Sequence, residues 1–479
     1  MNNEAGCYHT IRAVHACVYP GGMVTRCCVT MCPDWRMVTQ RRVTMPPGAG
    51  LHASVNCSSR EPTVSARRYA SRVALLAGLG LAMLAGCSCE QPRPRPMPAP
   101  SVGVKDQPIV RVRLGDETPK AWVAVMAPWR LIGPAGQVAA GEKLEWTELI
   151  CQGGGVVFAG QPPIRGGVEL YTEADGAIWV RQNVNGKERD RYYRGYLRVL
   201  PTAAGALRII NILPMEHYLA GVVGGEMPSS WNVEALKAQA VAARSYAVAE
   251  SNGRTKSDFD LYDSTLSQVY AGCGVEADSV WRALAATQGI VATYNAGWGK
   301  SQVLTAYFHS TCGGGTVPSG GIFGGATPAP LQGVVCNYCR NSPKYHWGEV
   351  VLTKQEIGEA LKKTGYTALV KLKAVARVEV ANTFGDGGRA AGIRVVDEAG
   401  AAVIVDANYF RGILGPSRIL STWFDIEDRG KSIALVNGRG WGHGVGLCQY
   451  GARYLADRGK TAEEILRFYY PKVELVRAY

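Results

Sequence analysis

The sequence predicts an α+β fold in which a β-rich N-terminal part leads into a mixed α/β core. Short alternating apolar segments, separated by Gly, Pro and Asp-Gly turn signals, follow one another over residues 107–212. An Ala-rich segment over 233–249 has the composition of a long helix, because Ala is the strongest helix former. Two Gly-rich stretches, 309–345 and 438–446, are too irregular for simple connectors and predict functional loops.

Residues 64–87 have the pattern of a secretory signal peptide. A basic stretch precedes a short apolar run over 73–83, and small residues follow up to Cys87. The run is too short for a comfortable transmembrane helix. The Leu-Ala-Gly-Cys ending resembles a bacterial lipobox, which implies cleavage before Cys87, a lipid on its thiol, and an exported lipoprotein facing the periplasm or cell wall. The alternative is a buried apolar helix that ends in Cys.

Residues 1–63 are predicted to be a spurious or disordered upstream extension, because a signal peptide should begin near the true N-terminus. Six of the 14 cysteines lie there, without clear periodicity: Cys7, Cys17, Cys27, Cys28, Cys32 and Cys57. Such a set can also mark a disulfide or metal framework. Residues 88–106 are Pro-rich and predict a semi-extended tether between anchor and domain.

Length and charge set broad limits. A chain of 479 residues has room for two or three domains, and its 47% hydrophobic content is ordinary for a globular protein. Residues 1–87 contribute +6 to the net charge of +13. The remaining +7 suits an anionic polymer such as a cell wall or nucleic acid, but a solvated surface explains it equally well. Because nucleic-acid binding conflicts with export, we expect no nucleic-acid partner.

The predicted elements follow from local patterns. Residues 107–200 are expected to form the β-rich part, and residues 201–479 the core. Strands are predicted at 109–114, 121–126, 154–158, 168–171, 177–181, 289–294, 303–308, 374–380, 392–396, 402–405 and 433–436, with a hairpin formed by 192–200 and 207–212. Helices are predicted at 233–249 with Asn232 as N-cap, at 279–287, at 353–363, and at 462–470 behind a Thr461–Glu464 capping box.

One acidic residue stands out where the hairpin meets the long helix. Glu226 lies between Gly224-Gly225 and Met227-Pro228. Pro cannot donate a backbone hydrogen bond, and Gly permits turns, so we expect Glu226 on a bent connection. An arbitrary Glu in such a place is most often a surface carboxylate.

Five segments together resemble one known family. They are LPMEHYLAGVVGGEMP, ALKAQAVAARSYAVA, YDSTLSQVYAG, AYFHSTCGGGT and GRGWGHGVGLCQYGARYLADRG. In this order they are similar to the motifs of the SpoIID/LytB family (stage II sporulation protein D and relatives), from about residue 107 to the C-terminus. The resemblance implies an Ala-rich helix and Gly-rich loops around a groove. The Gly-rich stretch 438–446 lacks a following Lys-Ser/Thr pair, which argues against a phosphate-binding loop.

The resemblance implies a peptidoglycan lytic transglycosylase. Such enzymes cleave glycan strands between N-acetylmuramic acid and N-acetylglucosamine and leave a 1,6-anhydro end. Glu226 matches the family's catalytic acid, and this chemistry needs one carboxyl rather than the two of most hydrolases. A pKa raised towards neutrality would suit its double role as acid and base. No cofactor is required for this reaction.

Further residues in the motifs are implied to contact substrate, although plain structural support is an equal alternative for each. They are Lys237, Gln239, Arg244, Gln268, Tyr270, His309, Ser310, His443, Gln449 and Tyr450. Of these, His443 is expected most strongly to face a ligand, because it stands among glycines.

The cysteines depart from the family pattern. Some members bind zinc through a His-Cys pair where this chain has Leu266 and Ser267. Conversely, Cys312 and Cys448 stand where many members have Ser, and a Cys-x-x-Cys pair follows at Cys336 and Cys339. If the loops border one groove, the four form a structural zinc site or two disulfides, or stay separate thiols.

Two rival functions remain at this point. A non-catalytic wall-binding protein that stimulates a separate amidase would carry the same motifs, and an intact Glu226 favours the enzyme. A zinc amidase would need an open site with His and carboxylate ligands. The seven His are scattered and no His-Glu-x-x-His occurs, which argues against it.

Overall fold

The computed structural model describes residues 14–18, 24–31, 37–39 and 107–479, apart from 174–175, 185–186, 255, 298 and 386–387. The chain divides into two compact units, Met1–Gln91 and Pro92–Tyr479. In the first unit, β1 (Val14–Val18), β2 (Val24–Met31) and β3 (Met37–Thr39) form a three-stranded antiparallel sheet. These strands lie within the predicted upstream extension, which stays a prediction. The predicted signal peptide, Cys87 and the tether lie outside the described residues.

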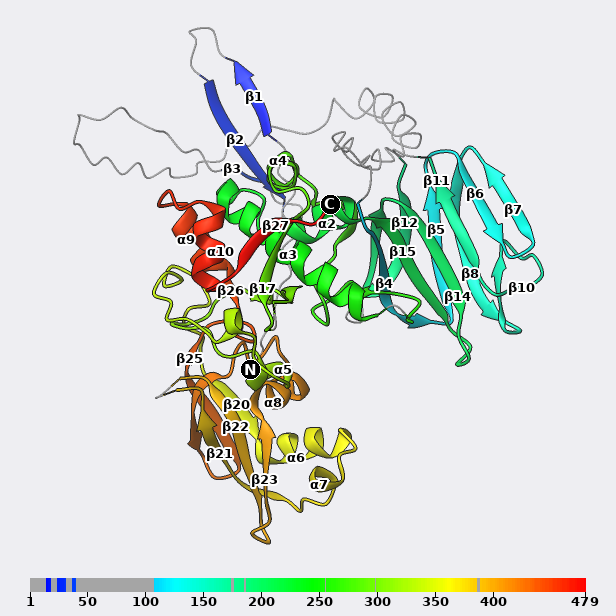
Figure 1. The fold of residues 1–479 in the computed structure, drawn as a ribbon. Coiled ribbons are helices and arrows are strands. Elements are labelled where there is room, and N and C mark those ends of the chain that lie inside the picture. The colour runs from blue at the N-terminus through cyan, green and yellow to red at the C-terminus, as the bar shows by residue number, and fades with distance from the viewer. Residues whose placement is uncertain are drawn as a thin grey trace, which may run out of the picture. The chain divides into compact units, whose positions relative to one another are not determined.

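The second unit begins with a β-rich region, cyan to green in Figure 1, built from two mostly antiparallel sheets. The larger sheet holds, in spatial order, β16 (Leu261–Tyr262), β4 (Ile109–Thr118), β15 (Leu207–Pro214), β14 (Tyr196–Pro201), β11 (Val168–Thr172), β6 (Trp129–Gly133) and β7 (Gly136–Gly141). The other holds β10 (Ile164–Arg165), β9 (Gly155–Phe158), β8 (Leu144–Gln152), β5 (Lys120–Val125), β12 (Ile178–Val184) and β13 (Lys187–Tyr193). The inward residues of both sheets, such as Val112 and Val123, belong to one hydrophobic cluster.

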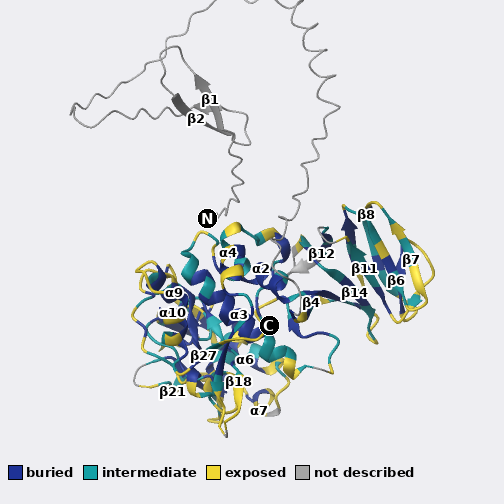
Figure 2. Cartoon of the chain, turned by 45° about the horizontal axis from the view of Figure 1, so that its top comes forward, coloured by how far each residue is buried: buried dark blue, intermediate teal, exposed yellow. Residues whose placement is uncertain are grey.

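Strand β15 of the larger sheet runs directly into the helical core. Its helices are α2 (Met215–Glu226), α3 (Val233–Gly253), α4 (Asp278–Ala286), α9 (Gln449–Ala456) and α10 (Ala462–Tyr469). Much of α2 and α3 is buried (Figure 2). The alanines of α3 let the neighbouring elements pack closely, because their side chains fill little space. Asn232 caps α3 by accepting the Glu234 N–H at 3.0 Å, which confirms the predicted N-cap.

Short strands and turns surround this helical core. They are β17 (Ile290–Asn295), β18 (Ser301–Val303) and β27 (Glu474–Arg477) in one sheet, the parallel pair β19 (Phe308–His309) and β26 (Leu447–Cys448), η1 (Gly272–Val275), α5 (Gly320–Phe323) and η2 (Ala329–Leu331). The strand predicted over 303–308 is wrong, because residues 304–307 belong to no strand.

A second hydrophobic cluster occupies the yellow to orange part of Figure 1. Two three-stranded sheets form it with three helices: β20 (Val350–Thr353), β25 (Ser432–Arg439) and β24 (Trp423–Asp428); β21 (Val375–Thr383), β22 (Ala390–Asp397) and β23 (Ala402–Asp406); and α6 (Lys354–Lys363), α7 (Thr367–Val370) and α8 (Ala407–Leu414). The predicted core 201–479 therefore contains a second core of its own, which the sequence analysis did not separate.

The observed elements bear out the α+β prediction. The 196–201 and 207–214 strands pair antiparallel, as the predicted hairpin requires. The Thr461–Glu464 capping box is present in both directions. Helices α2, α5, α7, α8 and α9 were not predicted. In the part of the chain that the structure describes, no helix combines the length and apolar character needed to cross a membrane.

Candidate active site

Glu226 is the last residue of α2, not part of a bent connection as the sequence had indicated. Met227 is extended, and its N–H donates to the Val223 carbonyl at 3.0 Å, which closes the helix. Pro228 follows and cannot continue the helical hydrogen bonding. The flanking glycines therefore lie inside a helix and need a different explanation.

The glycines of α2 permit close packing against the segment 269–275. A Cβ at Gly224 would collide with the Val275 carbonyl oxygen, and one at Gly225 would lie 2.9 Å from the Val269 carbonyl oxygen. Real Cβ atoms do not approach backbone this closely. Any larger residue at these positions would push the segment away from the helix end that carries Glu226.

This close approach supplies the principal polar contact of Glu226. The Val269 N–H donates to Oε1 of Glu226 at 2.7 Å, while the Gln449 side-chain amide lies 3.5 Å from Oε2. No ion pair to this carboxylate occurs among the described residues. Glu226 is half-buried.

Burial raises the pKa of Glu226 to about 7, and the hydrogen bonds from Val269 and Gln449 only partly oppose it. The position at the C-terminal end of α2 acts in the same direction as burial, because the negative end of the helix dipole disfavours a carboxylate. The side chain therefore holds a proton for part of the time at neutral pH and can also give it up.

Two glutamines connect this carboxyl group to neighbouring helices. Nε2 of Gln449, at the start of α9, lies 3.5 Å from Oε1 of Gln239 in α3. Gln239 is fully buried, and its Nε2 has no partner among the described groups. Both glutamines were predicted to contact substrate. The structure places the Gln449 amide beside the Glu226 carboxyl group, and Gln239 beside Gln449.

Ser310 and Tyr450 lie next to each other. The Tyr450 N–H donates to the Ser310 carbonyl at 3.1 Å, because β19 and β26 pair in parallel just before these residues. The Tyr450 ring meets Trp231 edge-on, with 5.0 Å between the ring centroids. The predicted residues Ser310, Gln449 and Tyr450 thus come together although long stretches of sequence separate them.

The two predicted histidines have structural contacts instead. Nδ1 of His443 accepts the Val445 N–H at 3.1 Å, so Nε2 carries the hydrogen and donates to the Phe308 carbonyl at 2.9 Å. Burial lowers the pKa of His443 to about 3, so the ring is neutral. His309 is also buried, and its Nδ1 lies 3.0 Å from the Val445 carbonyl oxygen. The expectation that His443 faces a ligand is not supported, because backbone groups occupy both of its ring nitrogens.

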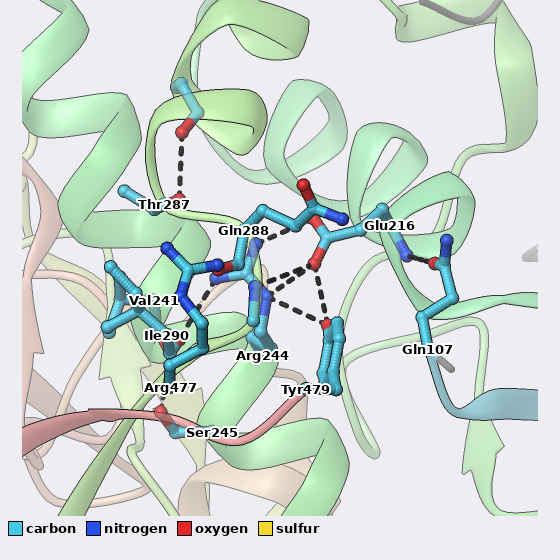
Figure 3. A network of polar contacts seen from close by, with 12 residues as sticks. Gln107, Glu216, Val241, Arg244, Ser245, Thr287, Gln288, Ile290, Arg477 and Tyr479 are labelled. Atoms are coloured by element: carbon cyan, nitrogen blue, oxygen red, sulfur yellow. Dashed lines mark hydrogen bonds and ion pairs between the residues drawn. The ribbon is translucent and has the colours of Figure 1, made fainter. Parts of the chain in front are cut away.

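Arg244 does not line a groove, contrary to the expectation. It is fully buried and holds Glu216 through two hydrogen bonds of 2.8 and 2.7 Å (Figure 3). The Tyr479 hydroxyl donates to the same carboxylate at 2.6 Å. This network ties α2, α3 and the C-terminus together.

Three other predicted contacts also serve the fold in this structure. Gln268 is buried and donates to the Tyr218 hydroxyl at 3.2 Å, and the buried Tyr270 donates to Asn211 at 2.8 Å. Lys237 forms an ion pair with Glu234 at 2.7 Å. The motif positions of Gln268 and Tyr270 therefore reflect packing and hydrogen bonding around α2 and α3. Lys237 is half-buried, and its contact with substrate stays a prediction.

The four cysteines of the predicted metal or disulfide set lie together. The Sγ atoms of Cys312, Cys336, Cys339 and Cys448 are all within 4.8 Å of one another, and all four residues are buried. Each is a free thiol in this structure. The sequence predicted the grouping only on the condition that the two loops meet, and they do.

The sequence analysis missed two features of this region. The Val269 N–H, a backbone group, carries no residue-type signal. A cavity of about 610 Å³ lies between the end of α3 and the 319–331 loop, with Tyr294, Tyr307 and Phe323 in its lining. Glu226 is not among the residues that line this cavity, so the groove expected around Glu226 stays a prediction.

Two family models match parts of this chain. A family model described as stage II sporulation protein matches residues 203–294, and a model of a domain of unknown function, DUF8618, matches residues 336–446. The second match coincides with much of the second hydrophobic cluster.

Three relatives are similar to this chain over longer stretches than the two family models cover. An uncharacterized protein of Brachyspira hyodysenteriae is 34% identical over 312 residues, which are 64% of this chain and 78% of the relative. Stage II sporulation protein D of Bacillus subtilis is 31% identical over 298 residues, 58% of this chain and 79% of the relative. The amidase enhancer of Bacillus subtilis is 27% identical over 299 residues, 54% of this chain and 40% of the relative. The chain belongs to the family of stage II sporulation protein D.

Proposed function

We propose that this protein cleaves the glycan strands of peptidoglycan as a lytic transglycosylase, with Glu226 as both acid and base. The family membership supports a role at the cell wall. The observation that carries the enzymatic step is a half-buried carboxyl group whose pKa is raised to about 7 and which has no cationic partner among the described residues. A general acid works best when its pKa lies near the operating pH.

The reaction needs one carboxyl group. Glu226 donates its proton to the glycosidic oxygen of the leaving sugar as the bond from C1 to that oxygen breaks. The C6 hydroxyl of N-acetylmuramic acid attacks C1, and the Glu226 carboxylate takes the hydroxyl proton. The product is a 1,6-anhydro sugar, no water is consumed, and Glu226 ends protonated as it began.

The contacts of Glu226 assign different tasks to its two oxygens. Oε1 accepts a hydrogen bond of 2.7 Å from the Val269 N–H, so it is the poorer site for a proton. Oε2 has only the long contact to Gln449, at 3.5 Å. We therefore assign the transferable proton to Oε2, with Val269 fixing the carboxyl plane.

Aromatic groups near the acid suit a sugar substrate. Trp231 and Tyr450 are both half-buried and in edge-to-face contact. Aromatic rings of this kind offer an apolar face together with a polar atom. We propose that they border the glycan strand beside Glu226 and limit access of water to the reacting bond.

The second candidate is a non-catalytic peptidoglycan-binding protein that stimulates an amidase. The similarity to the amidase enhancer of Bacillus subtilis favours it. In either case we propose an exported lipoprotein anchored through Cys87, with peptidoglycan as its polymeric partner.

The experiment compares the full chain with its Glu226→Gln variant on peptidoglycan whose stem peptides an amidase has removed. Mass spectrometry of the soluble products should show anhydro-sugars, each one water lighter than a hydrolysis product, from the wild type alone. Glu398→Gln, an exposed carboxylate in the second core, is the matched control and should release the same products as the wild type. No soluble product from any chain, with binding to the sacculus retained, would select the amidase-enhancer function.

A further inference from the structure

We propose that Cys312, Cys336, Cys339 and Cys448 bind one structural zinc ion that fixes the loops beside Glu226. The four Sγ atoms lie within 4.8 Å of one another in a buried position. Zinc–sulfur bonds of about 2.3 Å in a tetrahedron place the sulfur atoms about 3.8 Å apart. The cluster therefore has the size that a four-thiolate zinc site requires, and no His or carboxylate needs to complete it.

The ligands come from three separate segments. Cys312 lies between β19 and α5, Cys336 and Cys339 lie between η2 and β20, and Cys448 is the last residue of β26 and the N-cap residue of α9. The spacing Cys-Asn-Tyr-Cys is that of a zinc-binding turn, and the two sulfur atoms lie within 4.8 Å of each other. An ion at the centre would join three segments that have little regular structure of their own.

Neighbouring groups are arranged as they are around metal-bound thiolates. The Cys312 N–H donates to Sγ of Cys448 at 3.2 Å, and the Tyr469 hydroxyl lies 3.3 Å from Sγ of Cys336. Such donors stabilise negatively charged sulfur and orient it towards the metal. A Cβ at Gly451 would lie 3.3 Å from Sγ of Cys336 and would collide with the Tyr469 hydroxyl. The glycine leaves room for this arrangement.

A buried cation, Arg389, lies next to the cluster. Arg389 is 1% exposed, and among the described residues it contacts no carboxylate. Its guanidinium donates to the carbonyl oxygens of Cys312 at 2.9 Å and of Gly442 at 2.8 Å. An unpaired buried charge is costly. Zinc with four thiolates carries two negative charges, so it supplies the counter-charge that is otherwise missing.

The ion would act directly on the proposed acid's surroundings. Cys448 precedes Gln449, whose amide faces Glu226, and Cys312 lies two residues after Ser310, whose carbonyl accepts the Tyr450 N–H. Zinc would thus hold both segments in register. The existence of the metal site is independent of the proposed function, whereas its effect on glycan cleavage rests on that function.

The first test measures metal and thiol state together on the full chain, purified without chelator. We expect one zinc ion per chain by mass-spectrometric metal analysis. Peptide mapping should show the four cysteines protected from alkylation until a chelator is added, without any need for a reductant. Absence of zinc, with these peptides linked by disulfides or with four freely reactive thiols, would overturn the proposal.

Two variants test whether zinc binding depends on the four clustered cysteines or on any buried cysteine. Cys339→Ala should abolish stoichiometric zinc, whereas Cys273→Ala, a buried cysteine outside the cluster, should retain it. If Cys339→Ala does not fold, the wild-type chain reconstituted with Co²⁺ gives the answer. Four thiolates produce intense sulfur-to-cobalt charge-transfer absorption, which octahedral oxygen ligands do not. Failure to bind Co²⁺ with this signature would contradict the assignment.

The proposed zinc site and the proposed glycan cleavage can be refuted independently of each other. Glu226→Gln should keep its zinc while losing activity. A wild-type chain that binds zinc but releases no anhydro-sugar would defeat only the proposed function. A chain that cleaves glycan without zinc would defeat only the metal site.

Discussion

Two carboxylates on the same helix, one structural and one the proposed catalytic acid, differ in their surroundings. Glu216 lies in the first turn of α2 and Glu226 is its last residue. Glu216 is 1% exposed and pairs with the fully buried Arg244. Glu226 reaches solvent in part and has one backbone donor and one long amide contact.

The dipole of helix α2 increases the difference between the surroundings of Glu216 and Glu226. A carboxylate in the first turn interacts favourably with the positive end of the helix dipole, and one at the last residue interacts unfavourably with the negative end. Glu216 therefore has both the cation and the dipole in its favour, whereas Glu226 has neither among the described residues. The comparison teaches that burial alone does not raise the tendency of a carboxyl group to keep its proton. Under the proposed function, burial without a compensating positive charge marks the proton donor.

Glu226→Gln should have the largest effect. Gln keeps the size and the acceptor for the Val269 N–H but has no proton to donate. We expect the rate of anhydro-sugar release to fall by about 10²–10⁴-fold, the usual contribution of general acid–base catalysis, while circular dichroism stays unchanged. A variant with wild-type rates would show that another group supplies the proton.

Arg244→Met should lower the free energy of unfolding rather than act on the catalytic step itself. It leaves Glu216 buried without its cation, which typically costs about 3–5 kcal/mol. Chemical denaturation measures this loss. Arg394→Met is the control, because Arg394 and Glu379 form an exposed pair worth about 0–1 kcal/mol. Equal losses in the two variants would mean that the buried network is not a main support of α2.

Gly224→Ala tests whether close packing positions Glu226. The added Cβ meets the Val275 carbonyl oxygen, so we expect a loss of about 1–3 kcal/mol together with lower activity, as the Val269 N–H is pushed away. Gly253→Ala, where a Cβ meets nothing within 4 Å, should be neutral or slightly stabilising. A neutral Gly224→Ala would contradict the packing role.

The pH dependence should reveal the acid through activity and stability alike. Glycan cleavage should fall about tenfold per unit once the pH rises above the Glu226 pKa of about 7, because the proton is lost. The folded-state pKa lies above the ordinary Glu value of 4.5, so between these values the folded state binds more protons than the unfolded state. Stability from this group is therefore greatest below pH 4.5 and falls as the pH rises to about 7. Denaturation of wild type and Glu226→Gln across this window should show that the stability of the wild type relative to the variant falls as the pH rises, because all other titrating groups are common to both chains.

The sequence allowed the fold class and several elements to be predicted because their signals are local. Asn232 and the Thr461–Glu464 pair cap helices through neighbours a few residues away, and β14 and β15 are joined by a short turn. Helix α2 was missed because its glycines resemble a turn. Their purpose depends on the segment 269–275, which only the folded chain brings near.

The sequence predicted which residues belong to the site region, but not which of them lie beside Glu226 and which make internal structural contacts. The resemblance pointed to Glu226 as the acid and to Gln449 among ten residues that contact substrate, and the structure places the Gln449 amide beside the Glu226 carboxyl group. The same motifs also contain Arg244 and His443, whose polar side chains are satisfied inside the protein. Residue type does not distinguish a group that faces substrate from one that faces a buried carboxylate or a backbone amide.

The most direct measurement is a carbon-13 NMR titration of the Glu226 carboxyl group, identified as the signal that disappears in Glu226→Gln. A midpoint near pH 7 would confirm that burial without a cation keeps this acid protonated near neutrality. A midpoint at the ordinary Glu value of 4.5 would contradict it and would leave Glu226 as a solvated carboxylate with no proton to give.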